Sequence, residues 1–447
     1  MLNIGVDVSA VAYGVGLWLI LIVVPGTITW LKGQHALFAA GLVVGGLVWT
    51  ITAMRLARPD SWWARTFYAD EKLARTRARY ATPESPNNII GVASYDLLRD
   101  LPVTIESYSF EGLSQSFSAE FERLTTEIVF KGAGEEGRGE DVTYEGPAHV
   151  ALQEAGPIWD LAGEHTLGSL SAKLDGLDLF PVTPERDDYR DYRRWAFESA
   201  VLDLALRQAG KSLGDVLGRE PKPINYVVSM RLAPMGSDGP DKPDRLLDVL
   251  ERYPTTRFKL DPTNTWTPEL IATLVDTGAV DSLDLKGRYK GTPVDVETNP
   301  DLYRQVAEAF PDAWLEDPDL DSAEAMAVLE PHSDRVTWDA PIHSVADIEA
   351  LPFPPKTVNV KPSRFGPLER LFAAYDYCEQ QGIGAYGGGQ TELGVGRDQI
   401  QYLAALMHPH TPNDTAPKEF NMVQVPDGLP ASPIDLPIAP TGFRFAR

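Results

Sequence analysis

The second half of the chain alternates short apolar segments with longer segments whose apolar residues recur at helical spacing. Strands that are separated by a helix run parallel, because the crossover returns the chain to the same end of the sheet. The predicted strands are 224–231, 257–261, 282–286, 314–317, 336–339, 357–361 and 383–387, with a closing segment near 410–416. Seven strand–helix units and a closing segment predict a TIM-type (β/α)7β barrel over residues 223–416.

An open doubly wound sheet is the alternative arrangement of the same elements. A dinucleotide-binding version of that fold would carry Gly-x-Gly-x-x-Gly at its first strand–helix turn, and no such turn is present. The α/β barrel is therefore the favoured fold class.

Composition shifts mark the other parts of the chain. Residues 82–88 are rich in Pro and polar residues and indicate a linker over 82–102. An alternating segment at 104–144 and a helical segment at 192–210 indicate an α+β domain over 103–222. We expect residues 417–447 to pack back toward that domain.

The N-terminal residues 1–81 contain two uncharged apolar runs, 10–31 and 36–54. Each is long enough to cross a bilayer as a helix, and the basic, Trp-containing segment after Met54 is typical of the cytoplasmic side. We therefore expect a multi-pass protein of the cytoplasmic membrane, held by a transmembrane hairpin, with the barrel on the cytoplasmic side. A cleaved signal peptide fits less well, because no basic segment precedes the first run.

Two smaller features bear on partners. Gly41-x-x-x-Gly45 would let two membrane helices approach closely, which leaves a homo-oligomer open as one alternative. The net charge is −24 and the Lys/Arg excess is confined to the N-terminal 80 residues, which argues against a nucleic-acid partner. The one cysteine, Cys378, lies in a helical segment, and we expect it to be buried and inert.

Charged residues stand at the ends of five successive predicted strands. Active sites of such barrels lie at these strand ends, so we expect the five side chains to converge. Three are carboxylates that we predict to bind Mg²⁺, with Mn²⁺ as the alternative ion, because hard oxygen ligands suit these cations. The residues are Lys259, Asp284, Glu316, Asp339 and Lys361.

A lysine beside a metal-bound carboxylic acid suits removal of the proton alpha to the carboxylate. The metal would stabilise the enediolate that forms, and Lys361 or Lys259 would exchange the proton. Further cations at the same rim, Arg231, Lys286, Arg288 and Arg364 among them, indicate a small anionic substrate, most simply a carboxylate.

Several segments resemble the mandelate racemase/muconate lactonizing enzyme group of the enolase superfamily, in its muconate lactonizing and o-succinylbenzoate synthase branch. Leu315-Glu316-Asp317-Pro318 resembles the fourth-strand motif, 358–366 the sixth-strand lysine segment, and 387–394 the seventh-strand loop, with Glu392 as its glutamate. Gly137-Arg138-Gly139-Glu140 is similar to a motif of the capping domain. The resemblance implies that residues 103–222 cap the barrel and select substrate, with the loop 113–117 involved, and that Glu392 contacts substrate.

The chain departs from the family pattern on the second and third barrel strands. The usual Lys-x-Lys is Lys259-Leu260-Asp261, and the usual Asp-x-Asn is Asp284-Leu285-Lys286. The segment 261–266 also resembles the third-strand motif, but counting strands back from Glu316 favours Asp284 as the ligand. We assign Asp261 to the substrate-binding residues and regard Lys286 as a candidate replacement for the missing lysine.

These departures favour a one-base reaction over racemisation, which needs a base on each face of the substrate. The predicted function is that of a Mg²⁺-dependent lyase, dehydratase or cycloisomerase. The alternative is a catalytically altered barrel that serves as a membrane-tethered ligand-binding or scaffold protein.

Overall fold

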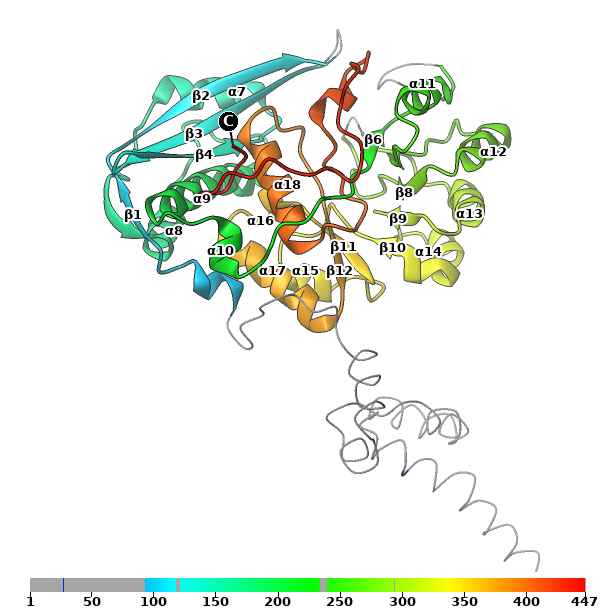
Figure 1. The fold of residues 1–447 in the computed structure, drawn as a ribbon. Helices are drawn as coiled ribbons and strands as arrows, with labels where there is room; N and C mark the ends of the chain where they lie inside the picture. The colour runs from blue at the N-terminus through cyan, green and yellow to red at the C-terminus, as the bar shows by residue number, and fades with distance from the viewer. Residues whose placement is uncertain (1–26, 28–92, 118–120, 234–238, 293, 447) are drawn as a thin grey trace, which may run out of the picture. The chain divides into compact units, whose positions relative to one another are not determined.

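Helix α9 and a three-stranded antiparallel sheet form the centre of the N-terminal part of the fold (Figure 1). The structure is a computed structural model that describes Thr27 and residues 93–117, 121–233, 239–292 and 294–446. The sheet consists of β2 (Ser107–Ser116), β3 (Glu122–Gly132) and β4 (Glu135–Asp141). It packs against α9 (Tyr189–Gln208).

Two glycines of β4 explain how closely α9 approaches the sheet. A Cβ on Gly137 would lie 2.3 Å from the carbonyl oxygen of Ala200, and one on Gly139 would lie 2.2 Å from that of Ala196. Any larger residue would therefore push the helix away from the strand. This close packing accounts for the Gly-x-Gly spacing in the sequence.

The remaining elements of this α+β part surround the sheet and α9. Strand β1 (Pro102–Ile105) pairs antiparallel with β5 (Gly163–Thr166). The helices are η2 (Ser94–Leu97), α7 (Gly146–Ala155), α8 (Leu167–Asp175) and α10 (Leu213–Leu217).

The second part of the fold contains seven parallel strands, and α-helices alternate with them (Figure 1). The strands are β6 (Val228–Met230), β7 (Phe258–Leu260), β8 (Val280–Asp284), β9 (Trp314–Glu316), β10 (Val336–Thr337), β11 (Thr357–Val360) and β12 (Gly384–Gly387). The helices that follow them are α11 (Asp244–Arg252), α12 (Pro268–Thr277), α13 (Pro300–Ala309), α14 (Ala323–Leu329), α15 (Val345–Glu349), α17 (Leu368–Gln381) and α18 (Val395–Met407). Three short helices complete the list: α16 (Pro362–Phe365), η3 (Glu330–Arg335) and η4 (Lys418–Asn421).

Local sequence signals fix where several of these helices begin. The side chains of Thr267, Asn299, Ser322 and Ser344 each accept a hydrogen bond from a backbone N–H in the first turn of the helix that follows. Such caps satisfy donors that have no partner within the helix. They set the strand-to-helix turns that carry the candidate site.

The barrel closes through the segment that the sequence predicted. Strands β6 to β10 form one parallel sheet, and the backbone N–H of Asn359 donates to the carbonyl of Trp338, which joins β10 to β11. Strand β12 continues through a parallel bridge from Gly388 to Asp414, and Asn413 bridges to Tyr226 next to β6. The parallel sheet and these bridges fit the predicted TIM-type barrel and its closing segment.

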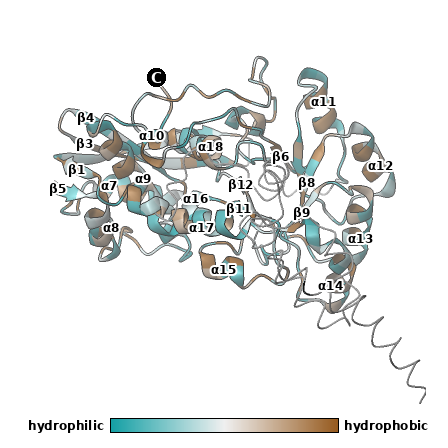
Figure 2. Cartoon of the chain, turned by 60° about the horizontal axis from the view of Figure 1, so that its bottom comes forward, coloured by the Kyte–Doolittle hydropathy of each residue, from teal (hydrophilic) through white to brown (hydrophobic). Residues whose placement is uncertain are grey.

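Apolar residues of the strands and the helices form one large core. Leu260, Leu283, Leu315 and Val360 are fully buried between the barrel strands and their helices. Figure 2 shows hydrophobic and hydrophilic patches side by side on the barrel helices, for example on α11 and α15. Cys378 is buried in α17, as expected.

The C-terminal segment contacts α9 of the α+β part. The backbone N–H of Phe443 donates to the Asp203 carboxylate at 2.7 Å, and the Phe443 ring packs against Trp195. Ser212 and Gly442 form a parallel bridge. Residues 442–443 therefore tie the chain end to the domain that precedes the barrel.

The membrane prediction is corrected. Apart from Thr27, the two apolar runs and the Gly41-x-x-x-Gly45 motif lie outside the described residues. Among the described residues, no helix is long and apolar enough to span a bilayer. The longest of them, α9, carries charges along its length, Arg190, Arg194 and Asp203 among them. This finding contradicts the predicted multi-pass localisation.

Candidate active site

The five charged residues predicted at the strand ends lie at the carboxyl ends of neighbouring barrel strands. Asp284 and Glu316 are the last residues of β8 and β9, and Lys361 directly follows β11. All five are buried: the exposed fraction is at most 2% for four of them and 7% for Lys361. Buried charges require partners, and the partners define the chemistry of the site.

Three carboxylates lie close enough together to hold one metal ion. Oxygen atoms of Asp284, Glu316 and Asp317 all lie within 4.8 Å of one another. Asp339, the predicted third ligand, is not in this group, and Asp317 is in its place. Burial and neighbouring carboxylates raise the pKa of Asp317 to about 7. A bound cation would relieve this crowding of negative charge.

Asp317 also holds the end of the next strand. Its two oxygens accept hydrogen bonds from the backbone N–H groups of Asp339 and Ala340, each at 2.8 Å. Its backbone is left-handed, with φ of 48°, a conformation that costs of order 1–3 kcal/mol for a residue with a side chain. The two hydrogen bonds offset that cost and fix the position of Asp339.

The ammonium of Lys259 lies among the carboxylates. It forms a short contact with Glu316 and lies 3.2 Å from Asp284 and 3.5 Å from Asp414. Burial alone would lower the pKa of Lys259, but Glu316 and Asp284 raise it well above its usual value. Lys259 is therefore a protonated counter-ion in this structure and a poor base.

Lys361 faces the site from β11, across the barrel from Lys259. Its Nζ lies 2.7 Å from the Oδ2 of Asp339. The same oxygen accepts a hydrogen bond from the Tyr289 hydroxyl at 3.1 Å and contacts Arg364 at 3.4 Å. Burial opposes ionisation of Asp339, but Arg364 and Lys361 lower its pKa, so this carboxylate is ionised.

Lys286 and Asp261 lie together beside the metal-competent group. The Nζ of Lys286 is 2.5 Å from Asp284 and 3.5 Å from Asp261. Burial raises the pKa of Asp261 to about 6, and the nearby Lys286 opposes that shift. Lys286 has a left-handed backbone, with φ of 54°, which turns the chain directly after β8. Asp284, and not Asp261, is grouped with Glu316.

A cavity of about 930 Å³ opens above these residues. The predicted residues Lys259, Asp261, Lys286, Lys361, Arg231, Arg288 and Arg364 all line it. Glu392 does not line it: its carboxylate pairs with Arg397 at 3.0 Å, and Arg397 reaches the cavity. The cavity is therefore rich in cations that could bind an anionic substrate.

The α+β part supplies one wall of this cavity, but not through the predicted loop 113–117. Within the described residues the lining side chains on that side are Phe121, Tyr144, Arg186, Asp188, Tyr189 and Tyr192. Leu113 belongs to strand β2, and Phe117 stacks on Phe121 instead. Two of the four aromatic residues in this wall, Tyr189 and Tyr192, come from the start of α9.

Sequence reasoning missed several residues of the site. Tyr289 and Tyr386 donate to Asp339 and Glu316, and Asp414 pairs with Lys259. Asp317 could have been identified from the sequence, because it directly follows Glu316 in the fourth-strand motif. The tyrosines had none, because an aromatic residue in a loop or strand is usually a packing residue.

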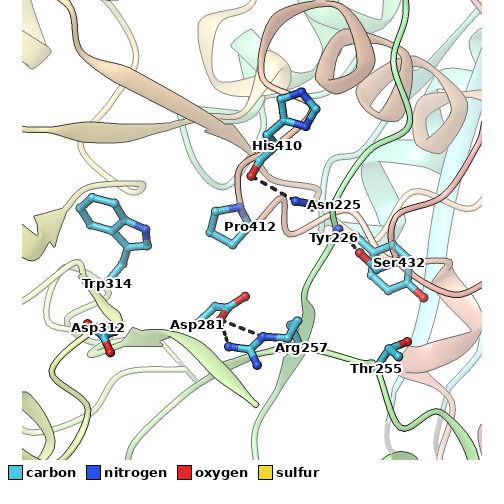
Figure 3. Close-up of a pocket in the computed structure, with 10 residues that line it drawn as sticks. All are labelled: Asn225, Tyr226, Thr255, Arg257, Asp281, Asp312, Trp314, His410, Pro412 and Ser432. Carbon is cyan, nitrogen blue, oxygen red and sulfur yellow. Dashed lines mark hydrogen bonds and ion pairs between the residues drawn. The ribbon is translucent and has the colours of Figure 1, made fainter. Parts of the chain in front are cut away.

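A smaller cavity of about 390 Å³ lies at the opposite end of the barrel (Figure 3). Its residues, such as Arg257, Asp281 and Trp314, lie at or just before the amino-terminal ends of their strands. Figure 3 shows Arg257 paired with Asp281 there. None of the predicted site residues lines this cavity, so it is separate from the candidate active site.

Comparison with known proteins agrees with this geometry. Residues 96–216 and 220–422 match the N-terminal and the C-terminal domain of a family described as a domain of unknown function (DUF8230). An o-succinylbenzoate synthase of Geobacillus kaustophilus is 28% identical over 237 residues, which are 49% of this chain and 58% of that enzyme. The chain thus matches less than two thirds of the length of that relative.

Two further comparisons cover more of the chain. An N-succinylamino acid racemase of an Amycolatopsis species is 28% identical over 327 residues, 69% of this chain and 82% of that enzyme. The crystal structure of a dipeptide epimerase of Methylococcus capsulatus, complexed with Mg, is similar with a TM-score of 0.54. It is 18% identical and covers 72% of this chain and 92% of the epimerase.

Proposed function

The chain has the enolase-superfamily fold, and we propose that it is a Mg²⁺-dependent enzyme that removes the proton alpha to a carboxylate of a small anionic substrate. The reaction class is that of a lyase, dehydratase or cycloisomerase. The observation that carries the proposal is the pairing of Lys361 with Asp339 at 2.7 Å beside the buried carboxylates of Asp284 and Glu316. Lys361 lines the cavity of about 930 Å³, and its ion pair with Asp339 connects it to the buried carboxylates beneath.

The donor set fits Mg²⁺, with Mn²⁺ as the alternative. Asp284 and Glu316 are grouped, and the buried Oδ1 of Asp339 has no hydrogen-bond partner within the described residues. An unpartnered buried carboxylate oxygen is costly unless a cation takes it. We propose Asp284, Glu316 and Asp339 as ligands, with Asp317 orienting Asp339. The bound cation supplies the positive charge that stabilises the substrate when its alpha proton leaves.

The chain's own residues divide the remaining work. Lys361 lines the cavity, and its ion pair with Asp339 holds it beside the ligands. To act as the base it must first give up one ammonium proton to solvent, and its neutral Nζ then takes the alpha proton. Lys259 stays protonated and balances the carboxylates from the other side. Arg231, Arg288 and Arg364 bind the anionic groups of the substrate from the cavity wall.

The second face of the substrate has a different environment. Asp261 stands where the family pattern has its second lysine, and it pairs with Lys286. One of the relatives is a racemase by name, and racemisation needs an acid–base group on each face. The aspartate at this position supports a one-base reaction. In that reaction Lys286 supplies positive charge to the substrate or donates a proton to it, and it does not remove one.

Deuterium exchange tests the proposal directly. The full chain is incubated with Mg²⁺ in D₂O with a panel of carboxylic acids that includes N-acylated amino acids, and proton NMR follows loss of the alpha-proton signal. We expect Mg²⁺-dependent exchange for at least one acid. Glu316→Gln should abolish both Mg²⁺ binding and exchange, whereas Glu324→Gln, an exposed glutamate on α14, should change neither. Exchange that persists in Glu316→Gln would exclude Glu316 as a ligand.

A ligand-binding or scaffold barrel is the second candidate function, and the Lys259-Leu260-Asp261 sequence favours it. The same experiment separates the two. Mg²⁺ binding and carboxylate binding without exchange of any alpha proton would support the binding protein. Exchange at an alpha carbon would exclude it.

A further inference from the structure

Asn359 carries a buried side-chain amide that has no hydrogen-bond partner in the part of the chain that the structure describes. It lies on β11, two residues before Lys361, and only 1% of it is exposed. Neither its side-chain oxygen nor its side-chain nitrogen has a partner within the described residues. Leaving a buried amide unpaired costs about 1–3 kcal/mol, so such a residue is expected to have a partner in some state of the protein.

The amide lies directly beside the Lys361 side chain. A Cβ placed on Gly388 would lie 2.4 Å from the Cε of Lys361 and 2.8 Å and 2.9 Å from the two terminal atoms of Asn359. Both side chains therefore lie over the same glycine. Because the last torsion angles of Lys361 can rotate, its Nζ is able to approach the amide oxygen from this position.

Lys361 has one ion-pair partner among the described residues, Asp339. On the proposed function, a divalent cation also uses Asp339. The cation withdraws negative charge from that carboxylate and repels the ammonium, because both are positive and the site is shielded from water. Lys361 then requires a second acceptor, and Asn359 has a free one.

We propose that Asn359 is a positioning residue: its side-chain oxygen accepts a hydrogen bond from the Nζ of Lys361 when a divalent cation occupies the carboxylate site. The ammonium moves from Asp339 to Asn359 as the metal binds. The hydrogen bond to Asn359 then fixes the position of the lysine side chain in the cavity, and Asp339 is free to bind the metal. This inference rests on the proposed function, because it needs a metal at Asp339.

An ordered water on the amide is the competing explanation, and the two make different predictions for a thermodynamic cycle. If Asn359 receives Lys361, its effect on metal binding must vanish when Lys361 has no ammonium. If it holds a water, its effect on metal binding does not depend on the lysine. A double-mutant cycle measures this dependence.

The experiment is isothermal titration of Mg²⁺ alone into the full chain and into Asn359→Leu, Lys361→Met and the double variant. We expect Asn359→Leu to weaken Mg²⁺ binding about tenfold, the size of a hydrogen bond to a charged group. Lys361→Met should tighten it, because the competing cation is gone. In the Lys361→Met background, Asn359→Leu should change the affinity less than twofold. An equal loss in both backgrounds, or no loss in either, would overturn the proposal.

Controls keep the outcomes separable. Leucine has about the size of asparagine and removes an unpaired buried amide, so Asn359→Leu should fold, and circular dichroism checks this; Asn359→Ala serves if it does not. Thr415→Val is the matched control: it removes a buried hydroxyl that, like the Asn359 amide, has no partner within the described residues, and it should leave Mg²⁺ affinity unchanged. No Mg²⁺ binding by the unmodified chain would contradict the proposed function. Binding without a Lys361-dependent effect would contradict only the role of Asn359.

Discussion

Lys361 and Asp339 form an ion pair between the ends of neighbouring strands, with 2.7 Å between Nζ and Oδ2. The pair joins the proposed base to a proposed metal ligand. One carboxylate cannot fully neutralise both a lysine and a divalent cation, so metal binding and the position of the base are coupled. On the proposed function, Asp339 holds the lysine when no metal is bound and releases it when a metal binds.

Removal of the Lys361 ammonium should stop catalysis and leave the fold intact. Lys361→Met keeps the length of the side chain, and we expect alpha-proton exchange to fall about 100-fold or more, the usual contribution of a positioned base. Proton NMR in D₂O measures it. The control is Lys356→Met, an exposed lysine at the opposite end of β11 that pairs only with Asp334 among the described residues. An equal loss in both variants would show that the effect is not specific to the site.

Asp317 should be needed to place Asp339. Asp317→Asn loses one of the two acceptors for the backbone N–H groups of Asp339 and Ala340, and an amide nitrogen then faces a donor. We expect the free energy of unfolding to fall by about 1–3 kcal/mol and Mg²⁺ affinity to fall as well. Chemical denaturation and calorimetric titration measure the two quantities. Asp312→Asn, at an exposed aspartate, is the control, and an equal effect there would refute the assignment.

Glu140 should fasten the α+β part to the barrel. Its buried carboxylate accepts hydrogen bonds from the backbone N–H groups of Leu393, Gly394 and Gly396, where α18 begins. Glu140→Gln replaces one acceptor with a donor, so we expect a loss of about 1–3 kcal/mol of unfolding free energy in chemical denaturation. Glu135→Gln, exposed in the same strand, should change it by less than about 0.5 kcal/mol. A loss no larger than this control would contradict the role of Glu140.

The sequence predicted the barrel because its period is regular and its strand ends are marked by charge. Asp284 and Glu316 stand directly opposite each other on neighbouring strands, and Lys259 lies opposite Ser282, two residues before Asp284. The regular spacing of the strand ends was therefore enough to predict that the three residues lie near one another. Six of the seven predicted strands were longer than the observed ones, because pairing stops where the chain turns into a loop or helix; β8 has the predicted length but begins two residues earlier. The first of them, predicted over 224–231, is β6 over Val228–Met230.

The contacts within the site could not be predicted in the same way. Whether Lys286 reaches Asp284 depends on its left-handed backbone, and whether Tyr289 reaches Asp339 depends on the path of a loop. Neither has a periodic signal. The sequence also could not show that Asp317, and not Asp339, lies in the group of three close carboxylates. That arrangement depends on local hydrogen bonds, such as the one from the backbone N–H of Asp339 to the Asp317 carboxylate.

His408 should make stability depend on pH in the mildly acidic range. Burial lowers its pKa to about 4, and its ring nitrogens bond Asn413 at 2.7 Å and Tyr375 at 3.1 Å. In the unfolded chain this residue is protonated below about pH 6.5, whereas in the folded chain it stays neutral until the pH falls to about 4. The unfolding free energy should therefore fall as the pH falls through that window, by up to about 3 kcal/mol from this residue. Denaturation curves at pH 7 and pH 4 should show that His408→Gln costs less at pH 4, whereas the exposed His410→Gln shows no such change. A cost of His408→Gln that is equal at both pH values would contradict a neutral, buried His408.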